Sequence, residues 1–404
     1  MKALKTLQII ITILMLSWLL PWVWKLATDK PQNNPFVYYS SLINSFGIRS
    51  TINETTLLTD ARDNSYTQTQ FDSILPMVYY RQLAREGQLP DSLHGQEINQ
   101  RIIARNNFFY RYRPSDKNQP LIPLYALFES MPKRIDLEMP GDIMRLRKKP
   151  EFINPDTGNS NTHKSARFAI ELEKNGFVGP PSLIAGNPTT RKSYDEGYVI
   201  VDQNKNLFHL KMVNARPYVA KIEMPEDLHL SWITVTEYPT KTFYCFLISK
   251  DGRLFTVQTD GYKLKEIPTP SFDPETDNLL IMGNLFHWNI QVSTNQRQTT
   301  YAVDAHSFKL VNQYTFETLP PKEWLQSSIF PFSINFSSAN DKFIFPRIKF
   351  NGWTHLPASV LLLLGYLALQ YRKKSWCPVT TILLLVTGIY GLLAFLLVGD
   401  TKHI

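Results

Sequence analysis

Three uninterrupted apolar stretches, one near the amino terminus and two near the carboxyl terminus, dominate the hydrophobic pattern of the chain. They cover Leu7–Trp24, Leu356–Tyr371 and Val379–Val398, and none contains Asp, Glu, Lys or Arg. Each approaches the roughly 20 apolar residues that a helix needs to cross a hydrocarbon core about 30 Å thick. The pattern therefore predicts three transmembrane helices that flank a large domain outside the bilayer.

Basic residues beside these stretches predict their orientation. Lys2 and Lys5 precede the first stretch, and Arg372–Lys374 separate the second from the third. Lys and Arg in short loops stay on the cytoplasmic side, so both clusters agree with a cytoplasmic amino terminus. The main domain is then expected outside the cytoplasm.

The first stretch has a second interpretation as a cleaved signal peptide, with Lys2 and Lys5 as its charged start. Its apolar run is long for a signal peptide and ends in a bulky Trp-Val-Trp sequence, and no clean small-x-small cleavage site follows. An uncleaved anchor is the favoured interpretation. Pro21 is expected to kink or end this helix near its outer end.

The main domain begins with patterns typical of helices. Helices are expected after Pro76, at Gln96–Asn106, and at Ser165–Asn175, where Gly176 follows as a left-handed cap. Phe108–Tyr112 is expected to form a strand. This part of the domain is therefore predicted to be a mixture of helices and strands.

Later in the domain, apolar strands alternate with turns that contain Asp, which predicts antiparallel hairpins. Three such hairpins recur at 198–213, 246–258 and 300–312, and Asp251-Gly252 is the strongest turn signal. Their spacing is near the ~40–50 residues of a propeller blade, and Trp232–Ile267 supplies four strands in order. The expected fold is α+β and β-rich, with a propeller-like or meander antiparallel part. A twisted antiparallel sandwich is the alternative.

These patterns divide the chain into six expected segments. They are an amino-terminal transmembrane anchor at 1–28, a mixed α/β region at 29–196, a propeller-like β region at 197–350, a second transmembrane helix at 353–371, a cytoplasmic loop at 372–378 and a third transmembrane helix at 379–399. Cys245 and Cys377 fall on opposite sides of the predicted bilayer and cannot form a disulfide. The main domain is therefore expected to be stabilised by its own core.

The formal net charge of +8 raises the question of nucleic-acid binding. Much of the excess comes from Lys and Arg beside the apolar stretches, and the main domain is close to neutral. A near-neutral domain offers no broad basic surface for phosphates. Nucleic acid is therefore not an expected partner.

One segment of the main domain, Gly186–Asp202 (GNPTTRKSYDEGYVIVD), concentrates polar and charged residues. Gly, Asn and Pro favour a turn at its start, and Arg191 is expected to pair with Asp195 or Glu196. A hydrogen-bonded junction between the helical part and the sheets is the favoured interpretation, and a ligand- or partner-binding loop is the alternative. The candidate binding residues are Thr189, Thr190, Arg191, Lys192, Asp195 and Glu196.

No sequence pattern for catalysis or for a metal is found. Asp202–Asn206 alternates like a calcium loop, but Leu207 and Val213 replace the Gly and Glu that an EF-hand needs. No His pair has a tight ligand spacing, and no nucleophile elbow, P-loop or dinucleotide fingerprint occurs. No catalytic residue, metal or cofactor is predicted. One metal possibility stays open, a site assembled across strands from His209, His229 and His287.

The apolar stretches carry no ionisable residue in their middles, although transport routes and proton relays usually need such groups. Thr387, Gly388 and Gly391 form a small-residue face in the third stretch. Small residues allow two helices to approach closely. We therefore expect this face to pack against another helix.

Two runs carry a family resemblance, FDSILPMVYYRQLAREGQLPDS at 71–92 and GNPTTRKSYDEGYVIVDQNKNLFHLKMVNARPYVAKI at 186–222. Both resemble the Bacteroidetes membrane proteins grouped as domain of unknown function 4857. The resemblance implies a Gram-negative inner membrane, a periplasmic main domain and a loose association with ABC-type transporter components. The family has no assigned activity, so it implies no catalytic residue.

The leading expectation is a membrane-anchored periplasmic protein that acts as a non-catalytic accessory or scaffold subunit of an ABC-type transport or envelope complex. Its expected partners are the lipid bilayer and another membrane protein, such as an ABC transporter permease. The alternative is a periplasmic hydrolase-type enzyme with a site on the β domain, which a deep pocket with converging carboxylates or histidines favours. A signal sensor is the third hypothesis, although the predicted cytoplasmic parts are too small for an output module.

Overall fold

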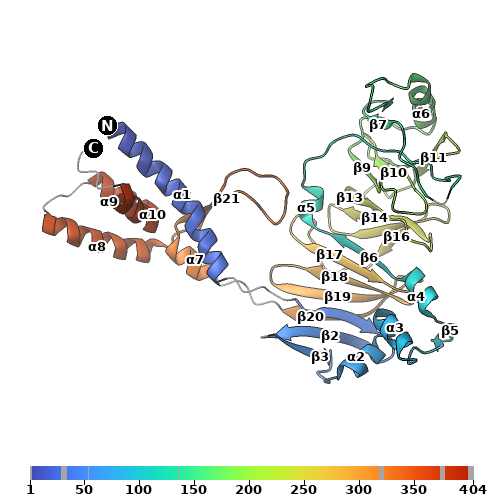
Figure 1. Ribbon diagram of the computed structural model, residues 1–404, viewed down its shortest axis with the longest axis horizontal. Helices are drawn as coiled ribbons and strands as arrows, with labels where there is room; N and C mark the ends of the chain where they lie inside the picture. Colours follow the sequence, from blue (N-terminus) through green and yellow to red (C-terminus); the bar gives the residue numbers. More distant parts are fainter. Residues whose placement is uncertain are drawn as a thin grey trace. The chain divides into compact units, whose positions relative to one another are not determined.

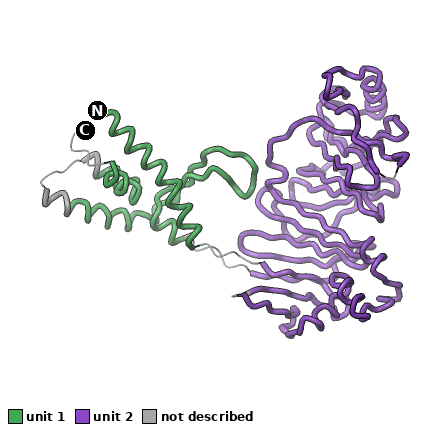
Figure 2. The backbone as a smooth tube through the Cα atoms, viewed as in Figure 1, with its two compact units in different colours: residues 1–33, 318–404 green, residues 34–317 purple. Residues whose placement is uncertain are grey.

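The computed structural model describes residues 2–28, 34–52, 54–134, 136–317, 323–373 and 378–398. The chain forms two compact units (Figure 2). Unit 2 is residues 34–317, and unit 1 combines residues 1–33 with residues 318–404. Most of the connection predicted at 372–378, including Lys374 and Cys377, and the tail after Val398 lie outside the described residues.

Unit 2 contains three antiparallel sheets whose strands follow one another along the chain as meanders (Figure 1). The first holds β9 (Leu183–Gly186), β10 (Tyr198–Val201), β11 (Leu207–Val213) and β12 (Arg216–Ile222). The second holds β13 (Leu230–Val235), β14 (Phe243–Ser249), β15 (Leu254–Gln258) and β16 (Leu264–Ile267). The third holds β17 (Asn278–Gly283), β18 (His287–Ser293), β19 (Arg297–Asp304) and β20 (Leu310–Glu317), with β6 (Phe108–Tyr112) beside β17.

Smaller elements complete unit 2. The first strands, β1 (Phe36–Ser40), β2 (Ser45–Ile52) and β3 (Thr55–Asp60), form a sheet of their own. Two short hairpins are β4 (Ser92–Leu93) with β5 (Gln96–Glu97), and β7 (Ile143–Leu146) with β8 (Pro150–Ile153). The helices are α2 (Gln68–Ile74), α3 (Pro76–Arg85), α4 (Gln100–Asn106), α5 (Pro114–Lys117) and α6 (Thr162–Lys174).

The sheets of unit 2 pack face to face, and each interface has its own apolar core. Phe246 and Trp288 lie between the second and third meanders, and Val199 and Leu247 lie between the first and second. At one end β7, β8 and α6 cover the first meander, and at the other β1 and β2 cover the third. The meanders are therefore blade-like units in an open row, because within residues 34–317 the two end layers lie apart (Figure 1).

The expected α+β, β-rich class is confirmed, and all three predicted hairpins form. Trp232–Ile267 supplies the four strands of the second meander, as its pattern predicts. The helix expected from Gln96 begins at Gln100 instead, because Gln96 and Glu97 pair with β4 and the Asn99 side chain caps the helix by accepting from the Ile102 amide. The boundary expected at residue 197 falls inside a sheet, since β9 pairs with β10.

The turn between β14 and β15 gives a direct test of the hairpin chemistry. Gly252 has φ +82, and a Cβ there would collide with the Phe272 carbonyl oxygen, whereas Gly158 has φ +72 with nothing within 4 Å of its Cβ position. Gly158→Ala is expected to cost about 1 kcal/mol for the left-handed backbone. Gly252→Ala is expected to cost at least about 1 kcal/mol more, from overpacking. Denaturant unfolding of both variants measures the difference, and equal losses would contradict the clash.

Unit 1 contains the apolar stretches. Its elements are α1 (Lys2–Thr28), α7 (Glu323–Ile329), β21 (Phe332–Asn335), β22 (Arg347–Phe350), α8 (Leu356–Lys373), α9 (Pro378–Thr387) and α10 (Ile389–Val398). A core that includes Ile13, Leu384 and Tyr390 joins α1 to α9 and α10. The α1 helix continues through Pro21 to Thr28, so of the two expected effects of Pro21, a kink or an end, the end is wrong.

Within α1, Ala3–Thr28 is long and apolar enough to cross a membrane, and in the described parts of the chain it is the one helix that meets this criterion. Leu356–Ala368 and Ile389–Val398 are shorter apolar helices. The third stretch differs from the single helix expected at 379–399, because Gly388 adopts φ +55 and separates α9 from α10. Each half has 10 residues and is about 15 Å long, roughly half of a hydrocarbon core.

The small residues of the third stretch lie at this break. A Cβ on Gly388 would come 2.9 Å from Ser359 Oγ of α8, and a Cβ on Gly391 would collide with Thr387 Oγ1 and come 3.5 Å from Leu384, both of α9. The Thr387 hydroxyl donates to the Leu383 carbonyl at 2.6 Å, within its own helix. The structure therefore places Gly388 where α8 comes close, whereas the neighbours of Gly391 belong to the preceding half of its own stretch.

Candidate functional site

The polar segment singled out in the sequence is the loop between β9 and β10. Tyr198 pairs with Gly186 across the base of the loop, and a Cβ on Gly186 would lie 2.5 Å from the Tyr198 ring. Gly197 has φ +64, and its amide donates to Asp195 Oδ1 at 2.7 Å. Gly186, Gly197 and the Asp195 carboxylate therefore determine the conformation of the loop where it joins β9 and β10.

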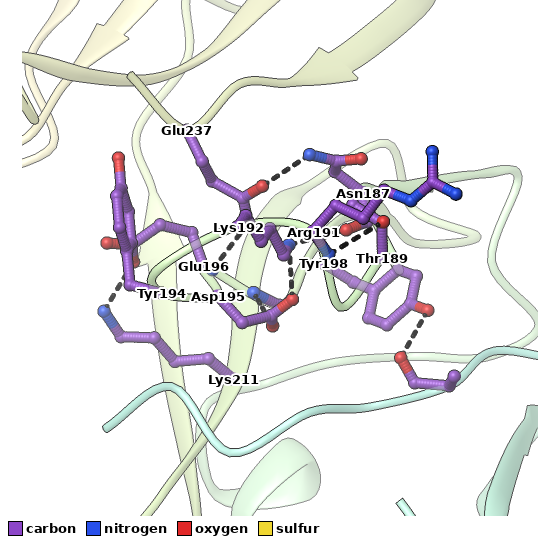
Figure 3. Close-up of polar contacts among 12 residues, drawn as sticks. Asn187, Thr189, Arg191, Lys192, Tyr194, Asp195, Glu196, Tyr198, Lys211 and Glu237 are labelled. Atoms are coloured by element: carbon purple, nitrogen blue, oxygen red, sulfur yellow. Dashed lines mark hydrogen bonds and ion pairs between the residues drawn. The ribbon is translucent and has the colours of Figure 1, made fainter. Parts of the chain in front are cut away.

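Lys192 lies inside the loop between two carboxylates (Figure 3). Its Nζ is 2.6 Å from Asp195 Oδ2 and 2.6 Å from Glu237 Oε1, and it also donates to the Asn187 carbonyl at 2.5 Å. The Lys192 side chain is only 8% exposed. We call Asn187, Lys192, Asp195, Glu196 and Glu237 the Lys192 cluster.

Glu237 is the acceptor at the centre of the Lys192 cluster. Asn187 Nδ2 donates to it at 2.6 Å and the Glu196 amide donates at 2.9 Å, in addition to Lys192. Burial raises the pKa of Glu237, and the donors from Lys192, Glu196 and Asn187 oppose that rise. Because Glu237 follows β13, the cluster joins the first meander to the second. The junction therefore links two sheets and not, as expected, the helical part to the sheets.

Glu196 connects the cluster to a buried histidine. Its carboxylate pairs with Lys211 Nζ at 2.8 Å, and its carbonyl accepts from His209 Nε2 at 2.5 Å. His209 Nδ1 then accepts from the Tyr262 hydroxyl at 2.8 Å. Both nitrogens of the neutral ring are thus used. Burial lowers the pKa of His209 to about 4, and the Lys211 charge adds to this effect.

The structure brings together three of the six predicted binding residues, Lys192, Asp195 and Glu196. Thr190 and Arg191 are exposed, and Arg191 points away from the cluster in Figure 3. Thr189 accepts from the Arg191 amide at 3.2 Å. The expected pairing of Arg191 with Asp195 or Glu196 is wrong, because Lys192 takes the inward position and Lys211 pairs with Glu196.

The Lys192 cluster is saturated by groups of the chain itself, so its geometry suits a structural junction. Over the described ranges, no group of three or more His, Cys, Asp or Glu residues is arranged to hold a metal ion. His209 is occupied by Glu196 and Tyr262, and His287 contacts the Tyr39 ring with centroids 5.0 Å apart. The metal site across strands is therefore not assembled among these residues.

Two of the cavities outside the predicted segment have aromatic or histidine side chains in their lining. One of about 260 Å³, between the second and third meanders, has an aromatic lining that includes Phe108 and Trp288 and contains no Asp or Glu. The other, of about 310 Å³, is lined by His94, His287, His306 and Asp304 among others. Asp304 Oδ1 already accepts from the His306 and Ser307 amides, at 3.1 and 2.7 Å. Three histidines and an aspartate therefore surround this second cavity.

An exposed apolar run is the feature that sequence reasoning missed. Pro120–Leu124 (PLIPL), between α5 and β7, is exposed at every position, and Leu121 and Ile122 are 74% and 76% exposed. We call these five residues the PLIPL segment. Two prolines in five residues disfavour helix and strand alike, so an apolar run of this kind has no secondary structure with which to bury itself. That combination is the signal that the sequence offered.

The family model described as a domain of unknown function (DUF4857) matches residues 36–303. None of the curated proteins is similar enough to count as a match.

Solved structures match only weakly. The Dos1 propeller gives a TM-score of 0.27 at 10% identity, over 71% of this chain and 62% of that one. PorZ, a surface component of the type-IX secretion system of Porphyromonas gingivalis, gives 0.23 at 8% identity, over 70% of this chain and 27% of that one. The chain thus spans about three fifths of the first and a quarter of the second. Overlaps this weak carry no argument about this fold or its function.

Proposed function

We propose that this chain, which belongs to the DUF4857 family, is a membrane-anchored periplasmic protein. In this proposal it is a non-catalytic accessory or scaffold subunit of an ABC-type transport or envelope complex. The family resemblance suggests a Bacteroidetes inner membrane and an ABC transporter permease as the partner. Unit 2 would then be the part that contacts other proteins.

The proposed anchoring rests on α1 and on the charges around it. Ala3–Thr28 is long enough to span a bilayer, and Lys2 and Lys5 at its start favour a cytoplasmic amino terminus. In the multi-pass arrangement that we propose, α8 and the α9–α10 pair lie in the same membrane beside α1. This arrangement keeps unit 2 on the periplasmic side.

The single observation that carries the binding role is the PLIPL segment. Runs of exposed apolar residues are rare on soluble domains and mark sites where another molecule covers them. The Lys192 cluster, by contrast, has its polar groups satisfied within the chain. The PLIPL segment is an exposed apolar surface suited to a partner, and the polar groups of the Lys192 cluster are already paired. Together, these two features favour a scaffold over an enzyme.

Site-specific photocrosslinking in native membranes tests this role. A photoreactive residue at Ile122 is expected to capture a discrete membrane protein, and one at Asn204, in the exposed β10–β11 turn, is expected to capture none. Leu121→Ser with Ile122→Ser should lower capture from a neighbouring exposed position, Leu124, at least about tenfold, which corresponds to about 1.4 kcal/mol. Equal capture from positions 122 and 204, or capture unaffected by the serines, would contradict the proposal.

The hydrolase alternative is favoured by one observation, the 310 Å³ cavity with His94, His287, His306 and Asp304. Burial lowers the pKa of His287 and the Asp304 charge opposes that shift, so a neutral imidazole faces this hollow. The test is hydrolysis of ester, phosphate-ester and glycoside substrates by the purified protein. Activity that His287→Gln abolishes would support the enzyme, whereas equal rates in both proteins would exclude this cavity as its site.

A further inference from the structure

The segment from β21 to the start of α8 carries an unusual number of exposed large apolar side chains. We call residues 332–353 the aromatic hairpin. Its strands pair from Phe332 with Phe350 to Asn335 with Arg347. Ile344 and Phe350 are 84% and 77% exposed. The other exposed large apolar residues of the hairpin are Phe336, Phe343, Phe345, Ile348 and Trp353.

Cations are interleaved with these apolar residues. The hairpin contains Lys342, Arg347 and Lys349 and a single acid, Asp341. Arg347 pairs with Asp341 at 2.7 Å, and its guanidinium lies 3.8 Å from the centroid of the Phe345 ring. The hairpin is therefore amphipathic and net positive.

The aromatic hairpin packs against the carboxyl-terminal half of α1, within unit 1 (Figure 1). Phe336 contacts Trp18 edge to face with ring centroids 5.8 Å apart. Phe330, just before β21, contacts Trp24 at 6.1 Å. Trp18, Trp22 and Trp24 all lie in this half of α1, and tryptophan gathers where a membrane span meets its interface. The aromatic hairpin therefore contacts α1 at the tryptophan-rich end of that helix.

We infer that the aromatic hairpin lies in the headgroup region of the outer leaflet and binds an anionic lipid surface. Water is unfavourable for so many exposed aromatic and aliphatic side chains. The hydrocarbon core is unfavourable too, because residues 337–344 have no regular backbone pairing and a lipid-exposed backbone must satisfy its own polar groups. The interface accepts both features, since aromatic side chains insert at the headgroup level while Lys and Arg meet lipid phosphates.

This inference rests on the proposed membrane anchoring by α1. The aromatic hairpin is continuous with the side of α1 that would face lipid, which favours lipid over a partner protein as the molecule that covers it. Trp18 and Trp22 of α1 are themselves exposed in unit 1. The exposed surface of the hairpin therefore continues an apolar surface that a bilayer would already cover. The α1 helix would give one anchor, and the hairpin a second that limits how the chain tilts.

Depth-dependent fluorescence quenching tests the inference on the full-length protein. A fluorophore is attached to Ile344→Cys in a Cys377→Ser background, and the protein is placed in vesicles that contain phosphatidylglycerol and nitroxide lipids. Buried Cys245 stays unlabelled in the folded protein because burial raises its pKa. The label at 344 is expected to be quenched at least threefold more by a nitroxide near the headgroup than by one deep in the acyl chain, and to be shielded from aqueous iodide.

Two further labels separate the possible failures. Leu14→Cys, in the middle of the apolar run of α1, is expected to respond most to the deep nitroxide, and Asn204→Cys only to iodide. If the label at 344 behaves like the one at 204 while Leu14 is deep, the hairpin inference fails and the anchoring stands. If Leu14 is also reached by iodide, the anchoring itself fails. Quenching of 344 by the deep nitroxide most of all would also overturn the interfacial placement.

A second measurement tests the lipid chemistry. In vesicles of phosphatidylcholine alone, the shallow quenching at 344 is expected to fall at least twofold relative to vesicles with phosphatidylglycerol. Lys342→Gln with Lys349→Gln should remove that difference. Quenching that is independent of lipid charge would contradict an anionic lipid surface as the occupant. A crosslink between the cysteines at position 344 of two copies of the chain would contradict it as well.

Discussion

Lys192→Met is expected to lower the free energy of unfolding of unit 2 by about 3–5 kcal/mol, the cost of leaving buried charges without their partner. Asp195 and Glu237 each lie 2.6 Å from the Lys192 ammonium and are nearly inaccessible to solvent. Methionine keeps most of the length of the lysine side chain but leaves these two carboxylates facing each other without a cation. Denaturant unfolding of the full-length protein, followed by circular dichroism near pH 7.5, measures the loss.

Arg191→Met is the matched control. Arg191 is the adjacent residue and also a long cation, but it is exposed, so its loss is expected to change stability by less than about 0.5 kcal/mol. Adding Asp195→Asn and Glu237→Gln to Lys192→Met should recover part of the loss because the unpaired charges disappear. Similar losses for Lys192→Met and Arg191→Met would show that the cluster does not hold the two meanders together.

Acidification is expected to destabilise unit 2 through His209 by about 3 kcal/mol in total. The folded pKa of His209 is about 4, below the unfolded value of about 6.5. Its contribution to the free energy of unfolding is therefore fully present above about pH 6.5 and is lost as the pH falls towards 4. In this interval His209 binds a proton in the unfolded chain but stays neutral in the folded one. Between about pH 7.5 and 4.5 the loss is expected to be about 2–3 kcal/mol.

His209→Gln isolates this effect. Glutamine offers a donor to the Glu196 carbonyl and an acceptor to the Tyr262 hydroxyl, yet it does not titrate. The variant is expected to lose about 2–3 kcal/mol less than the unchanged protein over that pH interval. Glu237, whose raised pKa acts in the opposite direction, is present in both proteins and cancels in the difference. His163→Gln, on the exposed side of α6, should leave the pH dependence unchanged. An identical pH dependence for all three proteins would contradict a buried neutral His209.

The hairpins were predictable because their chemistry is local. The Asp202 carboxylate accepts from the Asn206 amide at 2.8 Å, and Asp304 accepts from Ser307 at 2.7 Å, so the turns are fixed by residues a few positions apart. The α6 helix likewise ends where Gly176 adopts φ +83. All the residues that fix these turns and this helix end lie within a few positions of one another, so a short stretch of sequence is enough to predict them.

The rest depends on contacts that no local window contains. Glu237 reaches Lys192 from 45 residues away, which only the packing of two meanders brings about. The β6 strand joins β17 across a much longer separation, since Tyr112 pairs with Leu279, and no periodicity specifies that register. The break at Gly388 was hidden for another reason. A hydrophobicity pattern records that a residue is apolar, but it does not record that its φ is +55.

The proposed function requires unit 2 to lie outside the cytoplasm, and cysteine labelling measures this. An Asn204→Cys, Cys377→Ser variant presents one accessible thiol, because Cys245 is buried. With the outer membrane permeabilised and the inner membrane intact, an impermeant maleimide is expected to label position 204 fully. Labelling that appears only after the inner membrane is disrupted would place unit 2 in the cytoplasm and contradict the proposed function.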